Sequence, residues 1–280
     1  ETTAKEYETQ YRIPVQLQYG GSGTLLSNLR ISGAGDLYIA ADESYIRLAH
    51  ERGLIAETLP LVRQHPVIAV RKGNPKNVRS FDDLFMEGLA ISLANPEAAS
   101  IGRLSKDVLQ KSGTWARLEA RVKVFKPTVG DVANDVKLGS VDAGIVWDST
   151  VKQYPELEAV PIAELESHEE TVTIAVLKSS KDPSAALRFA RYLSARDRGL
   201  KHFKAMGYTP TDGDAWAETP ELVLFSGAVN RVAIEDTVKA FEAREGVRIS
   251  RVYNGCGILV AQMKAGGRPD AYLTCDESFV

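Results

Sequence analysis

Short apolar runs alternate with segments of helical periodicity along most of the chain. Strand-like apolar runs are expected at residues 15–18, 37–40, 67–70, 89–93, 122–125, 143–147, 171–177 and 223–225. Apolar residues at helical spacing, or a glycine closing such a stretch, predict helices at residues 25–29, 101–113, 129–138, 183–194, 197–206 and 234–241. Because strands alternate with helices, we expect an α/β fold with parallel, doubly wound sheets.

Turns rich in glycine and serine follow several of these strand-like runs and open helices. They lie at residues 20–24, 226–228 and 254–257. Ligands of open α/β sheets bind beyond the carboxyl ends of the strands. Helix N-termini there expose unpaired N–H groups with partial positive charge, which suits anions. The turns are therefore candidate anion sites.

Part of the chain is repeated. Residues 5–45 align without a gap on residues 239–279 at an offset of 234, with 12 of 41 positions identical. The second copy starts upstream with a strand-like run near residue 221, whereas the first lacks that strand and continues to about residue 210. A slice through a longer tandem protein explains this pattern. A circularly permuted module fits less well, because residues 242–280 would then duplicate an element already present.

Composition narrows the class of protein. Apolar content of 44% and charged content of 25% are typical of a globular protein, and a net charge of -3 with scattered Lys and Arg argues against nucleic-acid binding. No apolar stretch reaches the roughly 18–20 residues of a membrane helix. The chain opens on polar residues, without Met or a signal peptide, so we expect a processed or trimmed product.

Several segments, in order and spacing, resemble the periplasmic molybdate-binding proteins of ABC importers. They are Gly20–Leu25, Gly35–Asp42, Asn95–Glu97 with Gly102–Arg103, Asp142–Trp147, Ile174–Lys178 and the closing stretch 186–210. The resemblance implies capture of a small molybdate- or tungstate-like oxyanion and its delivery to a membrane permease. It also implies a periplasmic or extracytoplasmic location and no cofactor.

The resemblance implies a type II periplasmic-binding-protein-like fold, with two doubly wound lobes, two hinge crossings near 66–72 and 170–178, and a partial duplicated lobe. The expected parts are residues 1–72 with 171–211 as the first lobe without its first strand, 73–170 as the second lobe, 212–220 as a linker, and 221–280 as the start of a second module. We also expect the C-terminal piece to complete the first copy, within one chain or between two, because unpaired strand edges would otherwise remain.

The same resemblance implies a ligand site made of neutral donors, mostly hydroxyls and backbone N–H groups. The residues at matching positions are Ser22, Gly23, Ser100, Ile101, Val129, Trp147 and, in the second copy, Ser226. Three features depart from the family pattern. Ser100 replaces a usual proline, Trp147 stands where a tyrosine hydroxyl is common, and Asp148 adds a carboxylate that would repel a dianion. In the second copy, Cys256 replaces the binding serine. Another oxyanion, or a ligand of a different kind, therefore stays open.

Each candidate residue also has a structural interpretation. Ser22 and Ser226 are ordinary helix-capping residues in such turns, and Trp147 at a strand end is compatible with core packing. The carboxylates are expected to serve as capping or turn residues, with Asp148 alone also considered beside the ligand; they are Asp36, Asp42, Asp148, Asp270 and Asp276.

The two cysteines, Cys256 and Cys275, are expected to be separated by the first strand of their copy. At the usual strand spacing they would lie about 10 Å apart, too far for a disulfide. Two separate buried thiols are expected, with a soft-metal site as the alternative. The four histidines show no zinc-binding spacing.

Three classes of function fit this sequence to different degrees. A non-catalytic transport binding protein fits best, and a ligand-sensing regulatory module of the same fold is the alternative. An enzyme fits least, because no nucleophile–base pair, Walker-type loop or ligand cluster of catalytic type is present in the sequence.

Overall fold

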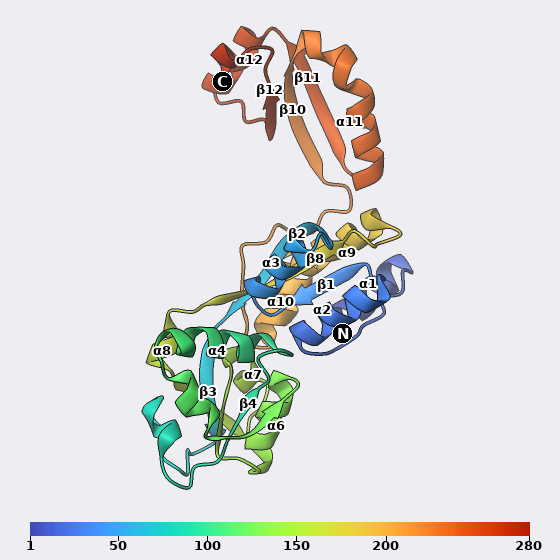
Figure 1. The fold of residues 1–280 in the computed structure, drawn as a ribbon. Helices are drawn as coiled ribbons and strands as arrows, with labels where there is room; N and C mark the ends of the chain where they lie inside the picture. Colours follow the sequence, from blue (N-terminus) through green and yellow to red (C-terminus); the bar gives the residue numbers. More distant parts are fainter. The chain divides into compact units, whose positions relative to one another are not determined.

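The computed structural model describes residues 1–280, apart from the side chain of Glu166. The chain forms two compact units, Glu1–Trp216 (unit 1) and Ala217–Val280 (unit 2) (Figure 1). The boundary between them falls inside the predicted linker 212–220. Among the described residues, no helix has the length and apolar character needed to cross a membrane.

The first sheet of unit 1 defines lobe I. Its strand order is β1 (Leu37–Ala40), β8 (Glu170–Leu177), β2 (Ile55–Gln64) and β9 (Thr209–Pro210). Every neighbouring pair is antiparallel, so the prediction of a parallel sheet is wrong here. The reason is that β8 returns from lobe II between β1 and β2 and runs against both. Helices α1 (Thr2–Tyr11), α2 (Ser22–Ser32), α3 (Glu43–Glu51), α9 (Pro183–Ser194) and α10 (Gly199–Ala205) belong to the same lobe.

The second sheet of unit 1 defines lobe II. Its order is β5 (Val122–Lys126), β4 (Ile91–Ala94), β6 (Ala143–Trp147), β3 (Pro66–Arg71) and β7 (Leu157–Pro161). Strand β4 runs parallel to β5 and β6, and β3 runs antiparallel to β6 and β7. The helical segments are η1 (Asp82–Phe85), α4 (Ser100–Lys111), α5 (Trp115–Glu119), α6 (Val129–Leu138), α7 (Asp148–Lys152) and α8 (Ala163–Glu166). A continuous apolar core fills this lobe.

The chain passes from lobe I to lobe II at a single residue, His65, which lies between the end of β2 and the start of β3. In Figure 1 the blue and light-blue strands on either side of it belong to different sheets. The apolar run of β3 is buried and pairs with β6 and β7, so lobe II starts at residue 66 and not at the expected residue 73. The chain returns between α8 and β8.

The predicted strand at residues 15–18 is absent from the structure. Helix α1 ends at Tyr11 and is capped by Arg12, whose φ is 59°. The chain then runs without regular secondary structure to α2. In unit 2 the equivalent stretch is strand β11 (Arg248–Asn254), which pairs along its whole length with β10 (Glu221–Gly227). Among the described residues of unit 1 no strand stands where β10 would, and an extended run without a partner is not stable as a strand.

Unit 2 is a three-stranded parallel sheet in the order β11, β10 and β12 (Ala271–Leu273). Its helical segments are η2 (Ala228–Asn230), α11 (Arg231–Glu245), α12 (Cys256–Lys264) and η3 (Glu277–Phe279). At the offset of 234, α12 starts at the residue that matches Ser22, the first residue of α2. A glycine precedes the first residue of both helices.

Candidate ligand-binding site

The N-terminus of helix α2 lies at the contact between the two lobes of unit 1. Ser22 is the first residue of the helix and only 6% exposed. Its Oγ accepts hydrogen bonds from the N–H of Ala41 at 3.2 Å and from the hydroxyl of Ser100 at 2.8 Å. Because Ser100 is the first residue of α4, the first turns of two helices from different lobes meet through their serine hydroxyls.

The lobes are in direct contact at this point. The N–H groups of Gly23 and Thr24 both point to the carbonyl oxygen of Ala98, at 2.9 and 3.3 Å. A Cβ on Gly21 would overlap the same oxygen and would lie 2.8 Å from the carbonyl oxygen of Pro127. Glycine at this position therefore allows lobe I to approach two loops of lobe II.

Lobe II supplies the start of a second and a third helix. Ser100 and Ile101 are buried in the first turn of α4. Helix α6 begins at the half-buried Val129, and the preceding Thr128 accepts the N–H of Asp131 at 3.1 Å. Since Pro127 lies against Gly21, the N-termini of α2, α4 and α6 gather in one region. Three such N-termini create a positive potential without a charged side chain.

Two predicted site residues have other surroundings. Trp147 ends β6, is 3% exposed and belongs to the apolar core of lobe II, so its contacts are those of a packing residue. Ser226 lies near the end of β10 in unit 2, is fully buried, and donates to the carbonyl of Gly227 at 3.3 Å. Contact of either residue with a ligand remains a prediction.

Gln64 is a residue of this region that sequence reasoning missed. It is 2% exposed, its Nε2 donates to the carbonyl of Ala41 at 3.0 Å, and its Oε1 accepts the hydroxyl of Ser149 at 2.9 Å. Gln64 thus connects the loop that binds Ser22 with helix α7 of lobe II. The available signal was a glutamine ending an apolar run just before a predicted hinge.

Tyr38 was also missed. Its hydroxyl donates to the carbonyl of Ser22 at 2.8 Å, and burial, followed by the negative charge of Asp42, raises its pKa above the usual value. The phenol therefore stays protonated and holds the start of α2 in place.

The carboxylates singled out in the sequence have structural partners. Asp148 accepts the N–H of His65 at 2.9 Å and the ammonium of Lys152 at 3.0 Å, which fixes the hinge. Asp42 and its repeat counterpart Asp276 accept backbone N–H groups at the starts of α3 and η3. Asp36 and Asp270 accept a serine hydroxyl and a backbone N–H, respectively. Capping and turn roles agree with these contacts.

Glu170, at the start of the returning strand β8, has a perturbed pKa. Burial, then the negative charges of Asp42 and Glu43, raises its pKa to about 7, although it accepts the N–H of Glu43 at 3.4 Å. Glu43 in turn accepts the hydroxyl of Thr173 at 2.8 Å. The carboxyl groups of Glu43 and Glu170 thus lie close together beside the second crossing.

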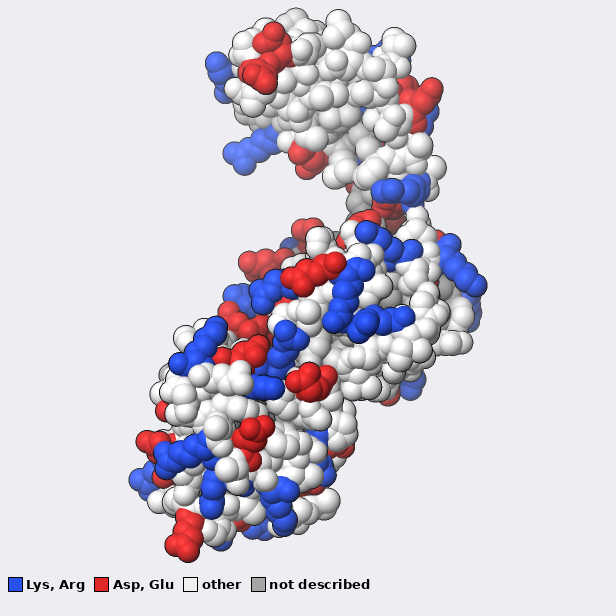
Figure 2. All heavy atoms as spheres, viewed as in Figure 1, with Lys and Arg blue, Asp and Glu red and all other residues white. Residues whose placement is uncertain are grey.

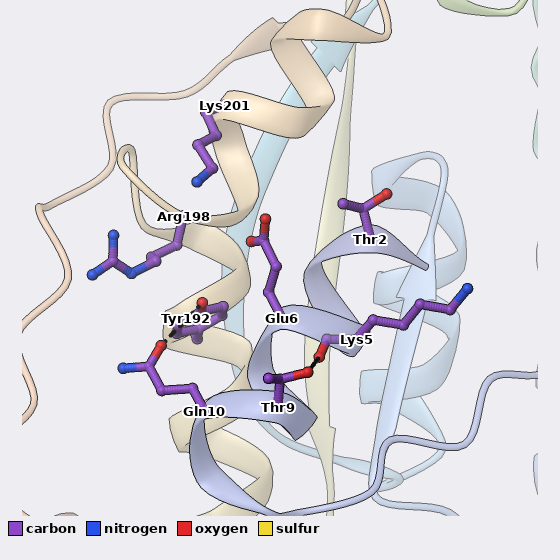
Figure 3. Close-up of a pocket in the computed structure, with 8 residues that line it drawn as sticks. All are labelled: Thr2, Lys5, Glu6, Thr9, Gln10, Tyr192, Arg198 and Lys201. Atoms are coloured by element: carbon purple, nitrogen blue, oxygen red, sulfur yellow. Dashed lines mark hydrogen bonds between the residues drawn. The ribbon is translucent and has the colours of Figure 1, made fainter.

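One groove on unit 1 lies away from Ser22 and Ser100. Its volume is about 560 Å³, and it lies between α1 and the α9–α10 region. Figure 3 shows the side chains that line it. Its lining residues are Thr2, Lys5, Glu6, Thr9, Gln10, Tyr192, Arg198 and Lys201. We place the candidate site at Ser22 and Ser100 because their hydroxyls join the two lobes, whereas the groove is open and mixed in charge.

The charged side chains form no single-sign surface on the face shown in Figure 2, where Lys and Arg are interspersed with Asp and Glu. Among the described residues, no group of three or more His, Cys, Asp or Glu side chains is placed to hold a metal ion.

The expected separation of the two cysteines is wrong. The Sγ atoms of Cys256 and Cys275 lie 2.8 Å apart. Strand β10 does run between β11 and β12, as expected, but it ends at Gly227. A Cβ on Gly227 would overlap Cys275 Sγ and would lie 2.9 Å from Cys256 Sγ. Because glycine has no Cβ, the two loops meet over the end of the central strand.

The chain has curated relatives among binding proteins. It is 29% identical over 213 residues to a putative ABC transporter substrate-binding lipoprotein, YvgL of Bacillus subtilis, covering 75% of this chain and 81% of that protein. It is 28% identical over 206 residues to a putative binding protein of Haemophilus influenzae, covering 73% and 83%. A molybdate-binding protein, ModA of Mycobacterium tuberculosis, is 26% identical over 185 residues, covering 65% and 69%.

Solved structures agree on the fold. The periplasmic molybdate-binding protein of Azotobacter vinelandii matches with a TM-score of 0.59 at 21% identity, covering 75% of this chain and 94% of that one. The periplasmic binding protein AfuA of Actinobacillus pleuropneumoniae, solved with fructose-6-phosphate, matches with a TM-score of 0.67 at 15% identity, covering 76% and 82%.

These likenesses agree with the two-lobed fold of unit 1. A family model described as bacterial extracellular solute-binding protein matches residues 1–209, three quarters of the chain. The chain therefore belongs to the bacterial extracellular solute-binding proteins and is similar to the molybdate-type periplasmic binding proteins of ABC importers.

Proposed function

We propose that unit 1 captures a small oxyanion of the molybdate or tungstate kind between its lobes and delivers it to an ABC permease. The observation that carries the proposal is the hydroxyl pair of Ser22 and Ser100, which joins the first turns of α2 and α4 across the two lobes. Such turns hold unpaired N–H groups and favour anions.

The proposed ligand contacts are neutral donors from both lobes. Lobe I provides the hydroxyl of Ser22 and the N–H of Gly23. Lobe II provides the hydroxyl of Ser100 and the N–H groups of Ile101 and Val129, each in the first turn of its helix. Oriented N–H dipoles neutralise an anion without a bulky counter-cation.

The closed structure supports a clamp mechanism. The N–H of Gly23 now donates to the carbonyl oxygen of Ala98, which is an acceptor with partial negative charge. When the lobes separate at His65 and the return crossing, this donor becomes accessible, and a ligand oxygen replaces the carbonyl. The ligand then favours closure because it binds both lobes only in the closed form.

The site argues for binding without turnover. Ser22 forms its hydrogen bonds with Ser100 and the N–H of Ala41, and neither can remove a proton from the hydroxyl as a general base would. The family and the fold are those of substrate-binding proteins. We propose that the protein works outside the cytoplasm, as its lipoprotein and periplasmic relatives do.

We further propose that unit 2 is the beginning of a second module of the same kind, joined through residues 212–220. Helices α1 and α11, helices α2 and α12, and strands β1 and β12 fall at the common offset of 234. In unit 2, β10 lies between β11 and β12. A parallel strand of the same kind completes lobe I in the same way, between residues 14–20 and the outer edge of β1, from a neighbouring module or a second chain.

The function is tested by thermal unfolding of the full chain with molybdate, tungstate, sulfate, phosphate and phosphonates, each against its chloride or sodium control. A ligand that binds only the folded state raises the melting temperature by mass action. A dose-dependent rise with molybdate or tungstate supports the proposal. No rise with molybdate or tungstate contradicts it, whether or not sulfate, phosphate or a phosphonate raises the melting temperature.

A further inference from the structure

The only two cysteines of the chain lie together at the carboxyl edge of the sheet in unit 2. Cys256 follows β11 and starts α12, and Cys275 follows β12. Their Sγ atoms are 2.8 Å apart, and the N–H of Cys275 also points to Cys256 Sγ at 3.4 Å. A disulfide requires about 2.05 Å between sulfurs, so a movement of less than about 1 Å joins them.

The first copy shows what the cysteines replace. At the offset of 234, Cys256 matches Ser22 and Cys275 matches Ala41. The N–H of Ala41 donates to Ser22 Oγ at 3.2 Å, in the same way as the N–H of Cys275 points to Cys256 Sγ. The two copies thus share the local backbone arrangement, and only unit 2 has a thiol at both of the matching positions.

We propose that Cys256 and Cys275 form an intramolecular disulfide that ties the loop after β11 to the loop after β12 across Gly227. The bond is made by exchange with a disulfide oxidant such as oxidised glutathione. The disulfide removes the thiol donor of Cys256, so α12 has no hydrogen-bond donor side chain where α2 carries the hydroxyl of Ser22. This inference does not depend on which ligand unit 1 binds.

The chemistry has a defined order. Hydrogen bonds from the thiol and the N–H of Cys275 lower the pKa of Cys256, and the thiol is also at a helix N-terminus, which favours a thiolate. The thiolate of Cys256 attacks the oxidant, forms a mixed disulfide and releases one thiolate. The thiol of Cys275 loses its proton and displaces the second thiolate. Two protein thiols are oxidised and one oxidant disulfide is reduced to two thiols.

The exposure of Cys275 and the extracytoplasmic location of related proteins both favour this oxidation. Cys275 is exposed and Cys256 is 8% exposed, so an oxidant reaches the pair from solvent on the side of Cys275. Disulfides persist outside the cytoplasm, where relatives of this chain are located.

Thiol counting tests the proposal on the full chain. After equilibration with oxidised glutathione, the denatured protein is expected to have no free thiol, to lose two hydrogens in intact mass, and to yield one cross-linked peptide that contains both cysteines. Reduction is expected to lower the melting temperature of unit 2 by on the order of 10 °C, because the bond closes a loop of about 20 residues.

Two kinds of variant serve as controls. Cys256→Ser combined with Cys275→Ala restores the residues of the first copy and is expected to make melting insensitive to reductant. Gly227→Ala places a Cβ against both sulfurs and is expected to reduce the oxidised fraction at least about tenfold at a fixed glutathione ratio. Gly255→Ala is the matched control, since its Cβ lies no closer than 3.9 Å to a neighbour.

Three results overturn the proposal. The first is two free thiols per folded chain after equilibration with the oxidant. The second is a disulfide between chains, seen as a covalent dimer without reductant. The third is a zinc or copper ion that co-purifies with the wild type, is absent from the double variant, and protects both thiols from oxidation.

Discussion

The hydroxyl of Ser100 donates to the hydroxyl of Ser22 over 2.8 Å, although 78 residues separate them. Each serine begins a helix in a different lobe, so the hydrogen bond forms only when the lobes are closed. In the proposed complex, a ligand that inserts between these helices replaces this hydrogen bond and meets donors from both lobes.

Gly21 is expected to control closure. Gly21→Ala places a Cβ against the carbonyl oxygens of Ala98 and Pro127, which belong to lobe II, so the lobes cannot close fully. We expect oxyanion affinity to fall at least about tenfold, with little change in the free energy of unfolding of the ligand-free protein. Calorimetric titration measures the affinity, and denaturant titration of the ligand-free protein measures the free energy of unfolding. Small-angle scattering with and without ligand follows closure.

Gly20→Ala is the matched control, because its Cβ would contact only the side chain of Leu25 in the same lobe, at 3.4 Å. Equal affinities for the two variants would show that the lobes do not close around the ligand at Gly21.

Gln64 is expected to stabilise the closed hinge. Gln64→Leu leaves the carbonyl of Ala41 and the hydroxyl of Ser149 without their partner in a buried place. We expect a loss of about 1–3 kcal/mol in the free energy of unfolding, measured by denaturant titration. The exposed Gln110 on α4 provides the control Gln110→Leu, with a change within about 0.5 kcal/mol. An unchanged free energy of unfolding in Gln64→Leu would contradict this role.

Glu170 is expected to make stability depend on pH. Its pKa is about 7 in the folded protein, against an ordinary value of 4.5. The folded state therefore binds more protons between these values, and its contribution to stability falls as pH rises from about 4.5 to about 7.

Glu170→Gln is expected to remove that dependence. The variant gains on the order of 1 kcal/mol at pH 8 relative to wild type, since solvent screens the half-buried carboxyl, and gains nothing at pH 4. Denaturant unfolding at both pH values measures the difference. A gain of equal size at pH 4 and pH 8 would point to packing instead of charge.

The amide hydrogen exchange of residues 14–20 is expected to show whether an added parallel strand completes lobe I. When a parallel strand pairs with this stretch, its amide hydrogens exchange slowly, as those of the paired β11 do. Hydrogen exchange followed by mass spectrometry compares the two stretches in one sample. Fast exchange of 14–20 at every protein concentration, beside slow exchange of β11, would show that lobe I stays without this strand.

Local signals in the sequence predicted much of the fold. Strand β6 and helices α6 and α9 were predicted at their observed bounds, because an apolar run, the terminal Gly139 and the initial Pro183 determine them locally. The prediction of a strand at residues 15–18 was wrong because a strand forms only beside a partner strand, and the sequence of these residues does not reveal whether a partner is present. The prediction of parallel pairing in lobe I was wrong for a related reason, since the direction of β8 depends on the path of the chain through lobe II.

The candidate site was predicted in part. Ser22, Gly23, Ser100 and Ile101 lie together in the structure, and their turns and helix starts are visible in the sequence. Gln64 was missed because its role depends on hydrogen bonds to two residues that are distant in the sequence, Ala41 and Ser149. The separation of the two cysteines was wrong because strand spacing alone does not account for Gly227, which has no Cβ and lets the two loops meet over the end of β10.

Calorimetric titration of molybdate into wild type, Ser22→Ala and Ser27→Ala tests the central claim most directly. Ser27 is an exposed serine of the same helix and serves as the matched control. The account predicts tight binding to wild type and Ser27→Ala, and an affinity about 10- to 100-fold weaker for Ser22→Ala, the cost of one hydrogen bond to an anion. Equal affinity in all three proteins, or no heat of binding in the wild type, would contradict it.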